Sequence, residues 1–418
     1  MSDVPSQQAV QRAAALAAYD RGDDDAAERL ASGLALLPLD GGLLIAAATL
    51  ALEERRADAL DRLEAMLRCA PDWLDGHVAL AALRWGAGDH DGFLTPIEAA
   101  LRMIPHHAGL WMRYMNLLAD SGEALRAADC AADLRRRGGD VPALRLIEAT
   151  HAGSIGANDR ANALLTSLPP GTPGRARAAA RQRLRTGDAQ ASLPLLDEAR
   201  ANAPHDVLTW ALTELAWRAV GDPRHAWLID DAAMIRRLPI AIDPMLAADL
   251  AAIHRNRWPV LGQSIRAGTQ TRGHLGHRRE PSIDALFKGL DEAVADHAAA
   301  LPRMAADHPL GVGRSGSQSI VAAWSVRLSD AGHHVSHVHP GGRFSSALHI
   351  AANADRDDAR REGWLELGRP PSDLPIGLEP LAAFPPIPGQ LTLFPSFLYH
   401  RTVPFRQGER IAVAFDVS

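Results

Sequence analysis

The sequence predicts a chain of two structural classes, with helical repeats in its first half and a β-rich domain near its end. The first half is rich in Ala, Leu, Arg and Glu, a composition that favours helices. Past about residue 310, short runs rich in Val, Ile, Phe and Trp alternate with Gly and Pro, as is typical of strands and turns. Helices first and strands last indicate an α + β multidomain chain, and 418 residues give room for two or three domains.

The helical half is periodic. Prolines recur 33 and 34 residues apart in one group and 34 and 35 residues apart in a second. The first group is Pro38, Pro71 and Pro105, and the second is Pro170, Pro204 and Pro239. Glycines have the same spacing of 34 residues at Gly88, Gly122 and Gly156, and again at Gly187 and Gly221. A glycine closes a tight turn between two helices and a proline ends the second helix, so we expect six or seven helix pairs over residues 8–240.

This period resembles that of the tetratricopeptide repeat. Trp111 and Trp210 each follow a repeat's proline by six residues, whereas His77 occupies that position after Pro71. The match to the repeat pattern is irregular over 142–170, so some of the helix pairs are expected to be degenerate. The resemblance implies an α-solenoid over residues 1–240, whose concave face is an expected binding site for a peptide or protein substrate.

The remaining elements are expected in two segments. Residues 241–310 are expected to form a helical junction that supports the β domain, with a helix over 284–300. Residues 311–418 are expected to form the β domain. Its predicted strands are 320–328, 343–351, 364–367, 390–394 and 410–417.

Histidines gather in the β-rich region. Residues i and i+2 of a strand point the same way, so His337 and His339 are expected to project from one face. His400, which follows a later predicted strand, is the third candidate metal ligand. His333 and His334 are expected to lie in a solvated loop.

Arg410 begins the last predicted strand and shares one face of it with Ala412 and Ala414. The small alanines leave a slot beside the arginine. A guanidinium at the end of such a slot can hold a carboxylate in a bidentate pair.

The order His-x-His, about sixty residues, His, ten residues, Arg resembles the double-stranded β-helix (jelly roll) of Fe(II)/2-oxoglutarate-dependent oxygenases. Segments 264–271, 308–309, 324–328 and 337–348 resemble a bacterial subfamily of these enzymes that is often fused to tetratricopeptide repeats. The resemblance covers about residues 250–418.

The resemblance implies that His337, His339 and His400 bind Fe(II) and that Arg410 binds the distal carboxylate of 2-oxoglutarate. Such a site leaves three coordination positions free for 2-oxoglutarate and O2. It implies a dioxygenase that hydroxylates a substrate while 2-oxoglutarate becomes succinate and CO2. The repeats favour a peptide or protein substrate.

Two positions depart from the family pattern. Most relatives have Asp or Glu where this chain has His339, so three imidazoles would leave the metal its full +2 charge. If His339 is not a ligand, two protein ligands remain and water or an anion completes the site. Ala412 replaces a serine that helps to hold the carboxylate, a task that the sequence leaves to Ser345 or Tyr399.

Composition excludes several functions. A net charge of −6 argues against nucleic acid as the main partner. No apolar run approaches the roughly 20 residues that span a bilayer, and two cysteines suit a reducing cytoplasm, where we expect the protein. Two alternatives to a hydroxylase remain open. One is a non-catalytic repeat scaffold with a relict β domain, and the other is a small-molecule dioxygenase with a three-histidine metal site.

Overall fold

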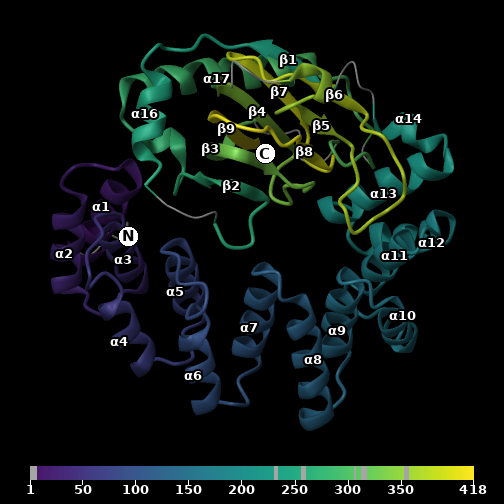
Figure 1. Cartoon of the computed structure of the whole chain (residues 1–418), viewed down its shortest axis with the longest axis horizontal. Coiled ribbons are helices and arrows are strands. Elements are labelled where there is room, and N and C mark those ends of the chain that lie inside the picture. The colour runs from purple at the N-terminus through teal and green to yellow at the C-terminus, as the bar shows by residue number, and fades with distance from the viewer. Residues whose placement is uncertain (1–6, 230–233, 256–259, 306, 312–317, 353–356) are drawn as a thin grey trace, which may run out of the picture.

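The computed structural model describes residues 7–229, 234–255, 260–305, 307–311, 318–352 and 357–418. Helices occupy the chain up to residue 228, and two antiparallel sheets with a few flanking helices follow (Figure 1). The predicted α + β class is therefore confirmed. Within the described ranges, every helix falls short of the length or the apolar character that crossing a membrane requires.

The helical region is built from consecutive helix pairs. In the described residues the pairs are α1 (Gln7–Arg21) with α2 (Ala26–Leu36), α3 (Gly41–Glu53) with α4 (Asp61–Cys69), α5 (Leu74–Gly86) with α6 (Thr95–Met103), α7 (Ala108–Asp120) with α8 (Ala124–Gly138), α9 (Pro142–Ser154) with α10 (Asn158–Ser167), α11 (Arg175–Arg185) with α12 (Ala189–Asn202), and α13 (Val207–Val220) with α14 (Arg224–Leu228). The stretch 142–170, where the repeat pattern of the sequence is irregular, still forms two helices, α9 and α10.

The periodic glycines and prolines act as the sequence predicts. Glycines of the 34-residue series have φ between +70° and +91°, which favours glycine in the turns that end helices: Gly88, Gly122, Gly156, Gly187 and Gly221. The side chain six residues after a repeat's proline donates to that proline's carbonyl: Trp111 Nε1 to Pro105 (2.7 Å), Trp210 Nε1 to Pro204 (2.7 Å) and His77 Nε2 to Pro71 (3.0 Å). His77 therefore keeps the hydrogen bond that tryptophan makes in the other two repeats.

The β region consists of two sheets. The larger has the strand order β1-β7-β4-β9-β3-β2 and the smaller has the order β6-β5-β8. The strands are β1 (Arg236–Pro239), β2 (Ile265–Gln270), β3 (Ile320–His334), β4 (Phe344–Ala351), β5 (Leu365–Leu367), β6 (Ala382–Phe384), β7 (Gln390–Pro395), β8 (His400–Thr402) and β9 (Arg410–Val417). The neighbouring pairs are antiparallel, as in a jelly roll.

The larger sheet begins earlier in the chain than expected. β1 pairs with β7 although it lies within the segment 1–240, and β2 pairs with β3 although it lies within 241–310. Both are edge strands, and β2 contains an irregularity at Ala267, where φ is +51°. A short or bulged edge strand is held by its partner more than by its own alternation, so its sequence signal is weak.

The segment between the repeats and β3 also contains α16 (Leu246–Ile253), the 3₁₀ turn η1 (Leu275–His277) and α17 (Pro281–Ala300). α17 begins three residues before the predicted helix because Pro281 suits the first helical turn. Its buried face includes Ile283, Leu286 and Leu290, which contribute to the same core as Phe344 of β4.

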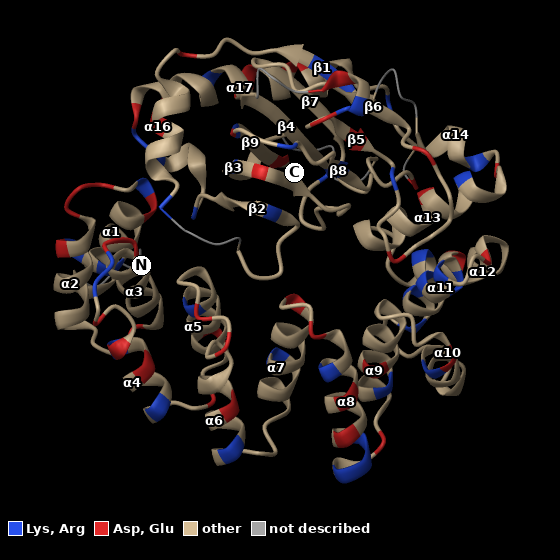
Figure 2. Ribbon diagram, in the orientation of Figure 1, with Lys and Arg blue, Asp and Glu red and all other residues tan. Residues whose placement is uncertain are grey.

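The repeats form an arc whose two ends meet the sheet domain (Figure 1). At the first end, Arg272 donates to Glu53 Oε1 (2.8 Å) and to the carbonyl of Tyr19 (2.8 Å). At the other end, Arg181 and Arg185 of α11 both bind the carboxylate of Asp373. Figure 2 shows the basic residues of α11 at this end of the arc.

The second end is also joined by a common core. One cluster of buried side chains includes Leu184 and Leu196, Trp210 and Trp217 of the last repeats, and Phe415 of β9. The last repeats and the sheets therefore bury each other's apolar surface.

Candidate metal centre

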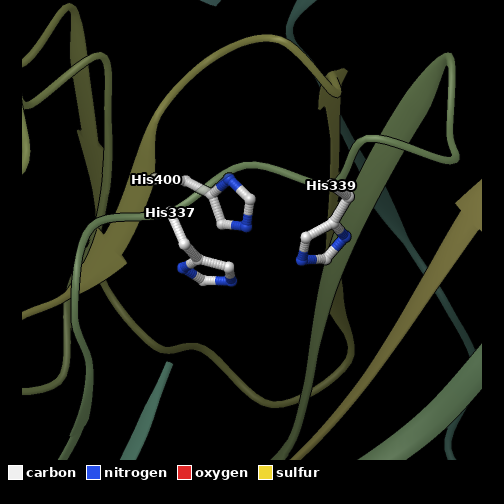
Figure 3. A group of neighbouring side chains, drawn as sticks. All are labelled: His337, His339 and His400. Atoms are coloured by element: carbon white, nitrogen blue, oxygen red, sulfur yellow. The ribbon is translucent and has the colours of Figure 1, made fainter. Parts of the chain in front are cut away.

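The structure brings together the three predicted metal ligands. His337 and His339 follow β3, and His400 begins β8. The backbone joins the two segments, because His337 N donates to His400 O (3.1 Å) and His400 N donates to His337 O (2.9 Å). One ring nitrogen from each residue lies within 4.8 Å of the others, and Figure 3 shows the three rings around a common space.

In each of the three rings, Nδ1 has a hydrogen-bond partner. The Nδ1 partners are Val335 O for His337 (2.8 Å), Asp416 Oδ1 for His339 (2.7 Å) and Leu398 O for His400 (3.1 Å). A carbonyl or carboxylate oxygen only accepts, so each Nδ1 carries a proton, and in the neutral ring Nε2 has the lone pair. This tautomer, fixed by an outer partner, is the one that metal-binding histidines use.

Burial keeps two of these rings, those of His337 and His400, neutral. Desolvation, with a smaller contribution from His339, lowers the pKa of His337 to about 3, and desolvation lowers the pKa of His400 well below its usual value. A metal binds the unprotonated form, so His337 and His400 need not lose a proton near neutral pH. Neutral imidazoles suit iron, zinc, copper and nickel.

The three rings line a cavity inside the sheets. Strands β3 and β9 form one wall, with Trp324, Val326 and Leu328 paired opposite Ala414, Ala412 and Arg410. Arg410, Ala412 and Ala414 all face this cavity, as the alternation of β9 predicts. The apolar wall restricts water at the end of the cavity where the arginine lies.

Arg410 is buried without a carboxylate partner among the described residues. Its Nη1 donates to Gly363 O (2.6 Å) and its Nη2 donates to His349 Nδ1 (2.9 Å), while Nε has no partner. Burial lowers the pKa of Arg410 to about 10, so the group remains charged at neutral pH. A buried cation with a vacant donor is costly unless an anion compensates it. The residues present therefore fit a carboxylate at this end and a metal ion at the other.

Ser345 and Tyr399 lie away from Arg410. Ser345 pairs with Asp416, which is six residues along β9 from the arginine, roughly 20 Å at 3.3 Å per residue. The hydroxyl of Tyr399 accepts a hydrogen bond from Arg181 Nη1 (3.0 Å) of the repeats. The expectation that either holds the carboxylate beside Arg410 is therefore corrected, and His349 is the side chain that contacts this arginine.

The sequence did not identify three other residues of the site. His334, expected in a solvated loop, ends β3 and stacks on His337 with ring centroids 5.6 Å apart. His349 could not be assigned a face without the register of β4. Asp416 could have been found, because extending the alternation of Arg410, Ala412 and Ala414 by two residues reaches it.

Residues 322–416, which include the three histidines and Arg410, match the family model described as putative 2OG-Fe(II) oxygenase. No curated protein matches the chain. Similar solved structures include a tetratricopeptide repeat protein from Parabacteroides merdae ATCC 43184 (16% identity, 54% of this chain and 91% of that chain, TM-score 0.37). They also include an oxidoreductase of the 2OG-Fe(II) oxygenase family from Burkholderia pseudomallei (16% identity, 51% and 90%, TM-score 0.28). A prolyl-4-hydroxylase from Pseudomonas putida matches at 16% identity (47% and 100%, TM-score 0.31).

The family model covers the sheet domain from β3 to β9 and leaves the repeats outside it. The part of the chain that contains the three histidines and Arg410 therefore resembles the putative 2OG-Fe(II) oxygenases.

Proposed function

We propose that the protein is an Fe(II)- and 2-oxoglutarate-dependent oxygenase that hydroxylates a peptide or protein substrate. One observation carries the proposal: a single cavity is lined by three histidines whose ring nitrogens could hold a metal and by a buried arginine to which the described residues offer no carboxylate. The family match over residues 322–416 supports the same chemistry.

In this proposal His337, His339 and His400 hold Fe(II), and Arg410 holds the distal carboxylate of 2-oxoglutarate. Arg410 carries five N–H donors, and among the described residues two of them are engaged, by Gly363 and His349. The vacant Nε–H and the remaining Nη hydrogens can receive a carboxylate. When bound, the metal and 2-oxoglutarate would activate O2, one atom of which would hydroxylate the substrate while the other would enter the succinate that forms with CO2.

A peptide or protein substrate is supported by the space between the repeats and the sheets. A cavity of about 720 Å³ is lined by Trp85 and Asp120 of the repeats and by Arg266 and Thr269 of β2. It shares Gln263 with the histidine cavity, so the two spaces adjoin. A substrate bound against the repeats would lie next to the proposed metal.

The test is an anaerobic titration of Fe(II) and 2-oxoglutarate, followed by the visible metal-to-ligand charge-transfer band, and then by succinate after O2 is admitted. We expect the wild-type chain to develop the band and His400→Ala to lack it. Iron binding without consumption of 2-oxoglutarate would favour a three-histidine dioxygenase. A chain that binds neither would favour a non-catalytic scaffold.

A further inference from the structure

Asp416 lies behind His339, and the function proposed above gives it no task. We propose that Asp416 supplies the negative charge of the metal site through the ring of His339, as a positioning residue rather than a ligand. The inference rests on the proposed function, because it requires a metal at the three histidines.

The observation is a difference among the three rings. His339 Nδ1 donates to Asp416 Oδ1 at 2.7 Å, and both side chains are largely buried. The other two rings donate to backbone carbonyls, those of Val335 and Leu398. His339 is also the position at which an acidic residue is usual in the resembling family. The carboxylate is thus present, one hydrogen bond further from the metal position.

The carboxylate of Asp416 is held in place by its surroundings. Ser345 Oγ donates to Asp416 Oδ1 (2.8 Å) and in turn accepts from Ser396 Oγ (2.8 Å). Gly342 passes close behind, because a Cβ added there would lie 2.8 Å from Ser396 Oγ and 3.1 Å from Asp416 Cβ. Oδ1 therefore has a fixed direction toward His339, which is what a positioning residue requires.

The physical effect is on the basicity of the ring. A carboxylate that accepts from Nδ1–H draws the proton toward itself, and Nε2 becomes a stronger donor to a metal. Three neutral imidazoles leave a divalent ion its full +2 charge, whereas the nearby carboxylate lowers the charge of the whole site to +1. Loss of such an outer partner costs about 10- to 100-fold in metal affinity.

The experiment uses the full chain and Co(II) alone, without 2-oxoglutarate, followed by the visible absorption of the bound ion. We expect Asp416→Asn to weaken Co(II) binding by about 10- to 100-fold. The matched control is Glu214→Gln in α13, which neutralises a fully buried carboxylate that also bonds a histidine, His225 (3.1 Å). This control should bind Co(II) as wild type does.

A second variant, His339→Asp, separates an effect of the negative charge of Asp416 from an effect of its packing. In His339→Asp the carboxylate is a direct ligand, so the further substitution Asp416→Asn should leave Co(II) affinity unchanged or improve it, because two adjacent carboxylates repel. A merely structural role predicts the same loss in both backgrounds together with a lower melting temperature. A loss in the wild-type background with none in His339→Asp would be non-additive, which is the signature of coupled residues.

The outcomes distinguish the two proposals. If the wild-type chain binds no Co(II), the proposed function fails with the inference. If the wild type binds and Asp416→Asn binds equally well, only the inference is overturned. Should Asp416→Asn not fold, the wild-type Zn(II) form decides through ¹⁵N NMR of its histidines. A proton on His339 Nδ1 with the metal on Nε2 supports the inference, and the metal on Nδ1 overturns it.

Discussion

Arg410 shows how one side chain can favour binding at the expense of stability. Its guanidinium is buried with its Nε unpartnered, and the described residues offer it no carboxylate. Within the described residues this charge is therefore uncompensated when no ligand is bound. A bound carboxylate would remove this cost, so binding energy and folding energy are coupled at this residue.

We expect Arg410→Met to lose most of its affinity for 2-oxoglutarate. Stranding one partner of a buried ion pair costs roughly 3–5 kcal/mol, which is about two to three or more factors of ten in Kd. The loss of affinity should be smaller in Arg410→Lys, because lysine keeps the positive charge but lacks the two parallel N–H donors with which a guanidinium binds a carboxylate. The measurement is a titration of 2-oxoglutarate into the Co(II) forms.

The control is Arg327→Met, which removes a half-exposed arginine paired with Glu409 and should leave 2-oxoglutarate binding unchanged. Without ligands, Arg410→Met should melt at least as high as wild type, since it removes a buried charge. Equal affinities in wild type and Arg410→Met would place the carboxylate elsewhere.

His297 makes stability depend on pH. It is buried beside Phe344, and neither ring nitrogen has a hydrogen-bond partner in the part of the chain that the structure describes. Burial, with a smaller effect of Arg236, lowers its pKa to about 4 from a usual value of 6.5. Because the folded-state pKa is the lower one, the full stability is present above about pH 6.5 and is lost as pH falls toward 4.

Replacing His297 by Phe should therefore flatten the acid side of the stability curve. A difference of 2.5 units corresponds to about 3 kcal/mol by pH 4. The measurement is the free energy of unfolding of wild type and His297→Phe in urea between pH 4 and 7.5. Parallel curves would show that another group causes the acid sensitivity.

At the scale of elements, the turns between the repeat helices require a positive φ, a backbone conformation that few residues other than glycine adopt. Gly122 lies in the turn between α7 and α8, and its φ is +91°. Gly138 is the last residue of α8, and its φ is not positive. A Cβ at either position meets no atom within 4 Å. The two glycines therefore differ in backbone conformation and not in available space.

We expect Gly122→Ala to destabilise the chain by about 1 kcal/mol and Gly138→Ala to stabilise it by roughly 0.4–1 kcal/mol. The first substitution forces a strained φ, and the second reduces the entropy of the unfolded chain. Thermal melts of the two variants check the opposite signs. A similar shift in both would mean that φ does not control these turns.

The elements that could be predicted are those whose own residues show a pattern, such as regular spacing or alternation. The 34-residue series of Gly and Pro gives the helix pairs, and β9 has the predicted bounds 410–417. The strands β1, β2, β6 and β8 were not predicted, because all four are edge strands and each is held by a single partner strand. The spacing of His337, His339, His400 and Arg410 identified the candidate site. Ser345 and Tyr399 were misplaced because distance across two sheets cannot be obtained from spacing along the chain.

At the scale of the whole molecule, the boundary between the repeats and the sheet domain is a shared core. Leu196 and Trp210 of the last repeats belong to the same buried cluster as Phe344 and Phe415 of the sheets. The edge strand β1 also precedes residue 241. The sheet domain is therefore incomplete without the end of the solenoid.

We expect a fragment that begins at residue 241 to lack a cooperative melt, because it exposes the apolar surface that α11–α13 cover. A fragment that begins at residue 172 retains these helices and β1, and it should melt cooperatively and bind Co(II). Far-UV circular dichroism and Co(II) absorption check both fragments. A fragment from residue 241 that folds and binds Co(II) would show that the sheet domain is stable without the repeats.

The attachment of the solenoid at both ends changes how the array should fluctuate. A free repeat array frays from its terminal repeats, since each of these has only one neighbour. Here α1 and α3 are tied through Tyr19 and Glu53, and α11 is tied through its pair of arginines, so the ends are the restrained parts. Opening should therefore begin in the middle of the arc, over α5–α8. Amide hydrogen exchange should be fastest in these central helices and slower in α3 and α13, the reverse of the order expected for an unattached array.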